Sequence, residues 1–170
     1  MNARLVLVPA FLTLFAASAA AQTAAPVVQP RADTAALRAE VLSVVNRLFD
    51  GMKKRDTALM RSLFHPSASL LSSSVRNGTP TISTDPIDAW IGSIGQAPAG
   101  VVLDERLMNT VVHVEDGLAT VWTEYELWIG DRFSHCGVDA MTLGKTGSGW
   151  KLLSIADTRR RTGCKQTPAR

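Results

Sequence analysis

Four side chains in the C-terminal half of the sequence could carry acid–base chemistry or hold an aromatic ligand: Trp122, Glu126, His135 and Asp139. Side chains two or four residues apart on a strand share a face, so Trp122 lies with Glu126, and His135 with Asp139. A two-residue turn at Gly130-Asp131 would pair Trp122 with Asp139 and Glu126 with His135. A carboxyl group near a histidine forms an acid–base pair. We therefore predict Asp139 and His135 as catalytic residues, and Trp122 and Glu126 as ligand-binding residues.

A simpler interpretation of these residues stays open. Glu126 and His135 are also an ordinary cross-strand pair for a solvent-exposed face, and Asp139 can make a structural or ligand-binding hydrogen bond. Trp90 and Tyr125 are predicted as further ligand-binding residues, although a buried tryptophan is often a plain core residue. Tyr125 is the only tyrosine in the chain, and the strand register decides whether it is a core residue or a possible acid.

The other polar residues give no sign of a cofactor. Asp157 and Arg159 lie two apart on a predicted strand, so they share a face and are expected to form a structural pair. His65, His113 and His135 are too far apart in the sequence to form a local zinc motif. The sequence also lacks a glycine-rich phosphate loop in the right context and a G-x-S-x-G nucleophile. We predict no metal and no cofactor.

The two cysteines, Cys136 and Cys164, permit a single intramolecular disulfide. An exported protein favours that bond, provided that the two Cα atoms come within about 7 Å. Two separate thiols are the alternative. A metal site that uses both His135 and Cys136 is disfavoured, because adjacent residues of a strand point to opposite faces.

Residues 1–21 predict a secretory signal peptide. Arg4 gives a positive start, Leu5 to Ala17 is apolar and uncharged, and Ala19 to Ala21 form a small-residue cleavage site. The apolar stretch is shorter than the roughly 20 residues that span a bilayer. Cleavage after Ala21 would leave 149 of the 170 residues, and the loss of Arg4 would lower the net charge from +3 to +2. We predict secretion, most simply to a bacterial periplasm, with no nucleic-acid partner and no membrane contact after cleavage.

The rest of the chain predicts helices first and long strands afterwards. After a flexible leader at 22–32, apolar residues recur at helical spacing from Leu37 to Met52, and shorter helices follow Asp56 and surround Trp90. A short strand is expected at 69–75, and long strands over 101–114, 118–129, 132–143 and 150–160. One domain would cover 33–164, followed by a C-terminal tail at 165–170. The order predicts an α+β fold, with the helices packed on one face of a curved antiparallel sheet.

This order of elements resembles the nuclear transport factor 2-like superfamily, and within it the SnoaL-like proteins. The resemblance covers about residues 34–163, and its most telling segments are 63–68 (LFHPSA), 117–121 (GLATV) and 137–151 (GVDA to GWK). It implies a cone-shaped fold, in which a bent sheet wraps a long helix and a pocket opens at the wide end. Members of the superfamily include enzymes and also domains without chemistry, so the fold alone does not give the function.

Asp139 falls where ketosteroid isomerases, which are related to this superfamily, carry an oxyanion-stabilising acid. The isomerase general base falls near Ser72 here, and its tyrosine near Leu48 or Phe49. Two of the three catalytic groups are therefore absent, and ketosteroid isomerase activity is not expected. Of the three catalytic groups of the isomerases, only the acid has a counterpart in this sequence, at Asp139.

The resemblance and the hydrophobicity of the strands disagree about which sheet face lines the pocket. If Asp139 points inward, the predicted register also turns Trp122 and Glu126 inward. Apolar residues of the opposite face, such as Val121 and Val138, would then suit a homodimer interface. Hydrophobicity alone instead places that apolar face against the helices. We favour the first arrangement, because a ligand pocket tolerates a few polar and aromatic groups.

Three functions are compatible with these observations. The first is a domain that binds a small apolar or aromatic molecule in the cone pocket. The second is a dimerisation or protein-interaction module that uses the sheet. The third is an acid–base enzyme, an isomerase, cyclase or hydrolase, in which Asp139 and His135 transfer protons.

Overall fold

The structure, a computed structural model, describes residues 33–167, so the predicted signal peptide and leader lie outside the described residues. Two helices come first, followed by a hairpin of two strands and a third helix: α1 (Asp33–Lys54), α2 (Thr57–Leu63), β1 (Phe64–Arg76), β2 (Thr79–Asp85) and α3 (Ile87–Gly95). Four long strands complete the chain: β3 (Leu103–Glu115), β4 (Leu118–Ile129), β5 (Arg132–Thr146) and β6 (Gly149–Thr158). Among these residues, no helix combines the length and apolar character needed to cross a membrane.

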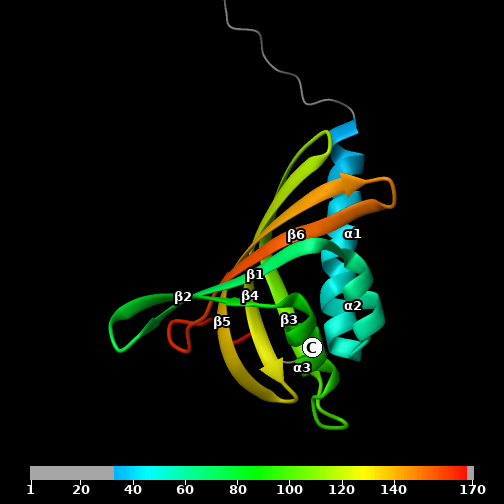
Figure 1. Ribbon diagram of the computed structural model, residues 1–170. Helices are drawn as coiled ribbons and strands as arrows, with labels where there is room; N and C mark the ends of the chain where they lie inside the picture. Colours follow the sequence, from blue (N-terminus) through cyan, green and yellow to red (C-terminus); the bar gives the residue numbers. More distant parts are fainter. Residues whose placement is uncertain (1–32, 168–170) are drawn as a thin grey trace, which may run out of the picture.

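The six strands form one curved sheet in the order β2-β1-β6-β5-β4-β3. Figure 1 shows the three helices gathered on one side of that sheet, with the β1–β2 hairpin reaching away from them. The predicted α+β fold, with helices on one face of a curved sheet, is confirmed. The sheet is mixed, however, because β1 runs parallel to its neighbour β6 while the other pairs are antiparallel.

The hairpin of β1 and β2 is the part of the fold that the prediction missed. Strand β1 begins at Phe64, before the predicted start at residue 69, and β2 was not predicted. Asn77 and Gly78 both have positive φ, 51° and 80°, which is the backbone of a tight hairpin turn that Asn-Gly favours. Strand β2 is exposed along its whole length, so it lacks the apolar alternation by which a strand is normally found.

Helix α1 forms one wall of the interior. Val41, Val45 and Leu48 are completely buried on its apolar stripe, and the helix packs against β3. Helix α2 starts where predicted, because the Asp56 carboxylate accepts a hydrogen bond of 2.9 Å from the backbone N–H of Leu59. The stripe of α1 continues to Met52, so its C-terminal part faces the concave side of the sheet.

The register of β4 against β5 differs by one residue from the prediction. The turn has two residues, as expected, because Ile129 pairs with Arg132. Trp128 then pairs with Phe133 but Leu127 pairs with His135, so Ser134 is an extra residue that forms a bulge. Beyond the bulge, each residue of β4 pairs with a residue of β5 one position later than predicted. Side chains that were predicted to share a face therefore lie on opposite faces of the sheet.

This bulge resolves the conflict between hydrophobicity and resemblance. Asp139 pairs with Thr123 and faces inward, together with Val121 and Tyr125, and all four are at most 3% exposed. Trp122 is 55% exposed on the outer face. The predicted pairing of Trp122 with Asp139 was wrong. The predicted apolar face is not one surface either, because Val121 of β4 faces the helices whereas Val138 of β5 pairs with Glu124 on the outer face.

The predicted disulfide between Cys136 and Cys164 is present, with the two Cα atoms 5.9 Å apart. Beside it, Cys136 and Arg160 exchange backbone hydrogen bonds of 3.0 and 2.9 Å. Further on, the backbone N–H of Thr167 donates to Glu126 Oε2 at 2.8 Å. Residues 165–167 therefore lie packed on the outer face of the sheet, held there by a covalent bond at Cys164.

Gly137 allows the end of β6 to approach β5 closely. A Cβ atom at this position would overlap the carbonyl oxygen of Thr158. The same carbonyl accepts a hydrogen bond of 2.9 Å from the Tyr125 hydroxyl. Because Gly137 has no side chain, the backbone at Thr158 can pack directly against Tyr125. The segment that leads to Cys164 begins there.

Candidate functional site

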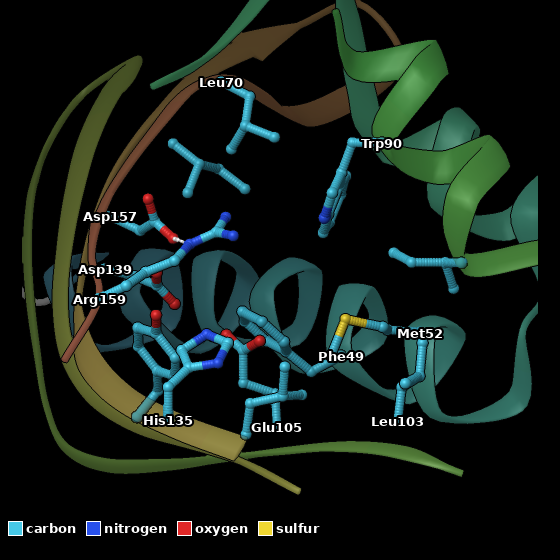
Figure 2. Close-up of a pocket in the computed structure, with 14 residues that line it drawn as sticks. Phe49, Met52, Leu70, Trp90, Leu103, Glu105, His135, Asp139, Asp157 and Arg159 are labelled. Atoms are coloured by element: carbon cyan, nitrogen blue, oxygen red, sulfur yellow. Dashed lines mark hydrogen bonds and ion pairs between the residues drawn. The ribbon is translucent and has the colours of Figure 1, made fainter. Parts of the chain in front are cut away.

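A cavity of about 120 Å³ lies between the concave face of the sheet and the helices α1 and α3. Figure 2 shows its lining, with Trp90 on the side of the helices and Asp139, Asp157 and Arg159 on the side of the sheet. Most of the wall is apolar or aromatic, formed by Phe49, Met52, Leu70, Trp90, Ile94, Leu103, Leu127 and Ile155. The polar lining is formed by Glu105, Tyr125, His135, Asp139, Asp157 and Arg159.

Four neighbouring strands supply the polar side chains. Glu105 comes from β3, Tyr125 from β4, Asp139 from β5 and Asp157 from β6. Asp139 and Asp157 are direct partners across β5 and β6, so their side chains leave the same face of the sheet side by side. Two acidic side chains at such positions repel each other, which makes them poor choices for stability alone.

Glu105 and Asp139 form a hydrogen-bonded pair of carboxyl groups. Burial, and then the charge of Asp139, raise the pKa of Glu105 well above its usual range. Burial likewise raises the pKa of Asp139 to about 7, although the hydrogen bond from Glu105 acts in the opposite direction. Two buried carboxyl groups in contact resist double ionisation, so the pair retains a proton near neutral pH.

The third carboxyl group of the cavity, Asp157, is paired with the only guanidinium group in the lining. Arg159 donates from Nε to Asp157 Oδ2 at 2.6 Å, the dashed contact in Figure 2. The pair expected from the sequence is confirmed. One side of the Asp157 carboxylate is therefore occupied, while Asp157 Oδ1 has no hydrogen-bond partner.

Tyr125 and His135 lie next to each other in the cavity wall, with their rings edge to face and the centroids 5.7 Å apart. Burial, and then the charge of Glu105, raise the pKa of Tyr125. Burial, followed by the charge of Arg159, lowers the pKa of His135. The tyrosine and the histidine are therefore both uncharged at neutral pH, and the imidazole keeps one nitrogen that can accept a proton.

The structure brings four of the six residues predicted for catalysis or ligand binding into this cavity: Trp90, Tyr125, His135 and Asp139. Trp122 and Glu126 lie on the other side of the sheet, since the bulge at Ser134 reverses their side relative to Asp139. Glu126 is fully buried there, beneath the C-terminal residues. Burial opposes its ionisation, but several hydrogen bonds, led by those from Thr167, outweigh that effect together and lower the pKa of Glu126.

Glu105 is the polar residue of the cavity that the sequence analysis did not single out, whereas Asp157 and Arg159 were expected only as a structural pair. Glu105 sits between Leu103 and Leu107, which share its face of β3 and pack against the hydrophobic core. An acid at an inward position of an otherwise apolar face is the signal that could have revealed it. Within residues 33–167, no three acidic, histidine or cysteine side chains are arranged to hold a metal ion.

The sequence profile of the family described as putative lumazine-binding matches residues 36–156. No curated protein matches the sequence. The match spans the helices and most of the strands around the cavity and ends one residue before Asp157, so it covers the domain rather than a local motif.

Solved structures with a similar fold include an NTF2-like protein from Cytophaga hutchinsonii, at a TM-score of 0.59 and 12% identity over 72% of this chain and 98% of that one. A putative dehydratase from the NTF2-like family of Streptomyces avermitilis has a TM-score of 0.55 and 16% identity, over 75% and 98% of the two chains. An NTF-2 like protein of unknown function from Silicibacter pomeroyi has a TM-score of 0.56 and 19% identity, over 74% and 98%. At these identities the similarity establishes the fold alone.

Proposed function

Because the chain belongs to the family described as putative lumazine-binding, within the nuclear transport factor 2-like superfamily, we propose that its cavity binds a small apolar or aromatic molecule. The observation that carries this proposal is the division of the cavity lining. Apolar and aromatic side chains form most of the wall, and a few polar groups converge from adjacent strands. Small-molecule sites commonly combine an apolar wall with a few fixed polar groups that orient the ligand.

The cavity volume limits the size of the ligand. About 120 Å³ is close to the roughly 150 Å³ of an engineered protein cavity that takes up benzene. A single aromatic ring therefore fits the cavity as it stands. A fused two-ring compound such as lumazine requires either a shift of the partly buried side chains Trp90 and Leu127 or a bound position that extends out of the cavity.

Binding is expected to raise the melting temperature of residues 22–170. A ligand that binds only the folded state stabilises it by about 2.7 kcal/mol at 100 times its Kd. The experiment measures melting temperature against concentration for two neutral compounds, benzamide and lumazine. An increase that saturates with either compound supports the proposal, and no increase with either of them or with the cation benzamidine at millimolar concentration contradicts it.

Two matched variants test whether the cavity is the binding site. Leu127→Trp places a large side chain in the cavity wall and is expected to abolish the increase. Leu118→Trp makes the same replacement on the same strand, at a side chain that is 54% exposed, and is expected to keep the increase. Equal responses of the two variants would place the binding site elsewhere.

The proposal includes export of the protein. The disulfide is consistent with an oxidising compartment, such as the periplasm or the extracellular space. Residues 1–21 supply the sequence signal for export. Mass spectrometry of protein secreted by a bacterial host tests this part, since cleavage after Ala21 would give a chain that begins at Gln22.

A homodimer is a second proposal, now on a different surface from the one predicted. Val111 and Trp122 are partners across β3 and β4 on the outer face of the sheet, and they are 47% and 55% exposed. Neighbouring exposed apolar side chains are a common feature of interfaces. Sedimentation velocity of the wild type and of Trp122→Ser tests this proposal. A dimeric wild type together with a monomeric variant supports it, and a monomeric wild type contradicts it.

Acid–base catalysis is the remaining alternative, favoured by the presence of Asp139 and His135 in one cavity. A carboxyl group with a pKa of about 7 suits proton transfer near neutral pH. Exchange of the α-protons of a single-ring ketone in D₂O, followed by NMR, is a direct test. If the wild type exchanges these protons and Asp139→Asn does not, the result supports catalysis. If the wild type exchanges them no faster than buffer alone, the result contradicts it.

A further inference from the structure

Three buried polar side chains lie in a row across the inner face of the sheet: Ser72, Asp157 and Asp139. Ser72 of β1 pairs with Asp157 of β6, and Asp157 pairs with Asp139 of β5. Their side chains are 8%, 8% and 3% exposed. We call these residues the acidic row. It runs across the strands in the direction of their hydrogen bonds, beside Leu70 in the cavity wall.

Each member of the acidic row has a buried oxygen without a hydrogen-bond partner: Ser72 Oγ, Asp157 Oδ1 and Asp139 Oδ2. Buried polar atoms are nearly always paired, because an unpaired one loses its interactions with water and gains nothing in return. Asp139 and Asp157 both line the cavity. Their unpaired oxygens are therefore available to whatever occupies it.

The chemistry of these oxygens defines the missing partner. An ionised carboxylate only accepts hydrogen bonds, so Asp157 Oδ1 requires a donor. Asp139 has one carboxyl oxygen beside Glu105 and the other unpaired. A ligand with N–H groups supplies such donors, whereas an apolar ring without polar substituents leaves the oxygens buried and unpaired.

The balance of charge favours a cation. The lining holds three carboxyl groups, of Glu105, Asp139 and Asp157, and one permanently positive group, of Arg159. His135 and Tyr125 are uncharged at neutral pH, and the side chains that the helices contribute to the lining are all apolar or aromatic. Even with one proton shared between Glu105 and Asp139, the negative charges outnumber the positive one.

We infer that the two carboxyl groups of the acidic row, Asp139 and Asp157, bind the cationic, N–H-donating end of a ring compound, such as an amidinium or an aromatic ammonium group. The ring of such a ligand lies against Phe49, Leu70 and Trp90, which Figure 2 shows around the same space as the carboxyl groups. This inference rests on the proposed function and gives the chemical class of the ligand. Charge-assisted hydrogen bonds to the carboxylates then provide selectivity for a cation over a neutral compound of the same shape.

Three compounds of nearly equal size and different charge test the inference: benzamidine (a cation), benzamide (neutral) and benzoate (an anion). Titration calorimetry at pH 7.5 measures their affinities for residues 22–170. Benzamidine is expected to bind at least about tenfold more tightly than benzamide, since a hydrogen bond to a charged group is about that strong. Benzoate is expected to bind more weakly than both.

Variants of the row connect this selectivity to its residues. Asp139→Asn and Asp157→Asn each remove a carboxylate while keeping the shape of the side chain. Each is expected to weaken benzamidine by about tenfold or more and to change benzamide by less than about threefold. Asp131→Asn, at an exposed turn, makes the same change of charge away from the cavity and is expected to leave both affinities unchanged.

The outcomes separate the inference from the proposed function. If benzamide binds as tightly as benzamidine, or if both Asp139→Asn and Asp157→Asn keep the preference for benzamidine, the inference is wrong and the cavity remains a binding site. Tightest binding of benzoate also overturns the inference, since Arg159 would then recognise the ligand. If none of the three compounds binds, the proposed function and the inference fail together.

Discussion

Asp139→Asn is expected to make the protein more stable at pH 8, by on the order of 2–4 kcal/mol, although the carboxyl group that it removes is buried. The pKa of Asp139 is about 7 in the folded protein, against roughly 3.9 in an unfolded chain. Between these pH values the folded state binds more protons than the unfolded state. Asp139 therefore lowers the free energy of unfolding of the wild type as the pH rises from about 4 to about 7, a contribution that Asp139→Asn removes.

The physical cause of this fall is the environment of Asp139. Its ionisation places a charge in a buried site next to two other acids, Glu105 and Asp157. Asparagine at the same position is neutral at every pH and can still hydrogen-bond to Glu105. The difference between variant and wild type should thus be small at pH 4 and reach its full size above pH 7.

Urea denaturation of both proteins at intervals of one pH unit measures this difference. Asp104→Asn is a control of opposite sign. Burial opposes ionisation there too, but hydrogen bonds from Lys53 and Arg106 outweigh it and lower the pKa of Asp104. Its carboxylate contributes stability above its unfolded pKa, so Asp104→Asn should lose stability at neutral pH and approach the wild type in acid. If the free energies of unfolding of the wild type and of Asp139→Asn change in parallel with pH, Asp139 ionises as easily as an exposed acid and the prediction is wrong.

Removal of the disulfide is expected to cost about 3 kcal/mol of stability, according to the chain-entropy account of loop closure. The bond joins β5 to the C-terminal residues across a separation of 28 residues. The closed segment contains β6 and, at its C-terminal end, the Asp157–Arg159 pair. Residues 165–167 lie beyond the segment and cover Glu126. Loss of the bond should therefore also weaken the packing of residues 165–167 on the outer face.

Cys164→Ser and reduction of the wild type should have the same effect, because each breaks the same bond. Urea denaturation with and without dithiothreitol makes the comparison. The wild type is expected to lose stability on reduction, and Cys164→Ser is expected to be less stable from the start and insensitive to dithiothreitol. A wild type that is unaffected by dithiothreitol at a concentration that reduces the bond would contradict this expectation.

The helices and the long strands could be predicted because their apolar residues follow a regular period. Strand β4 was predicted with its observed ends, and helix α1 from its apolar stripe. The β1–β2 hairpin escaped prediction because β2 is exposed and rich in serine and threonine. Its Asn77-Gly78 turn was the available signal.

The candidate site was predicted only in part, and a single residue, Ser134, explains why Trp122 and Glu126 were wrongly placed in it. Ser134 forms a bulge that leaves the turn unchanged but shifts every later pair by one. Period-2 alternation within each strand was assigned correctly, yet it says nothing about an extra residue between two strands. The prediction therefore placed Asp139 and His135 correctly on the same inward face. It placed Trp122 and Glu126 on that face incorrectly.

Methionine methyl NMR tests the central claim, that the cavity is a binding site, most directly. Met52 lies in the cavity wall, whereas Met60 and Met141 are buried outside the lining, so one spectrum contains both the probe and its controls. Protein labelled with ¹³C-methyl methionine is titrated with benzamide and with benzamidine, and Met52→Leu assigns the signal. The Met52 methyl resonance is expected to shift and saturate with either compound, while the Met60 resonance stays in place. A Met52 resonance that does not move while a methionine outside the lining shifts would contradict binding in this cavity.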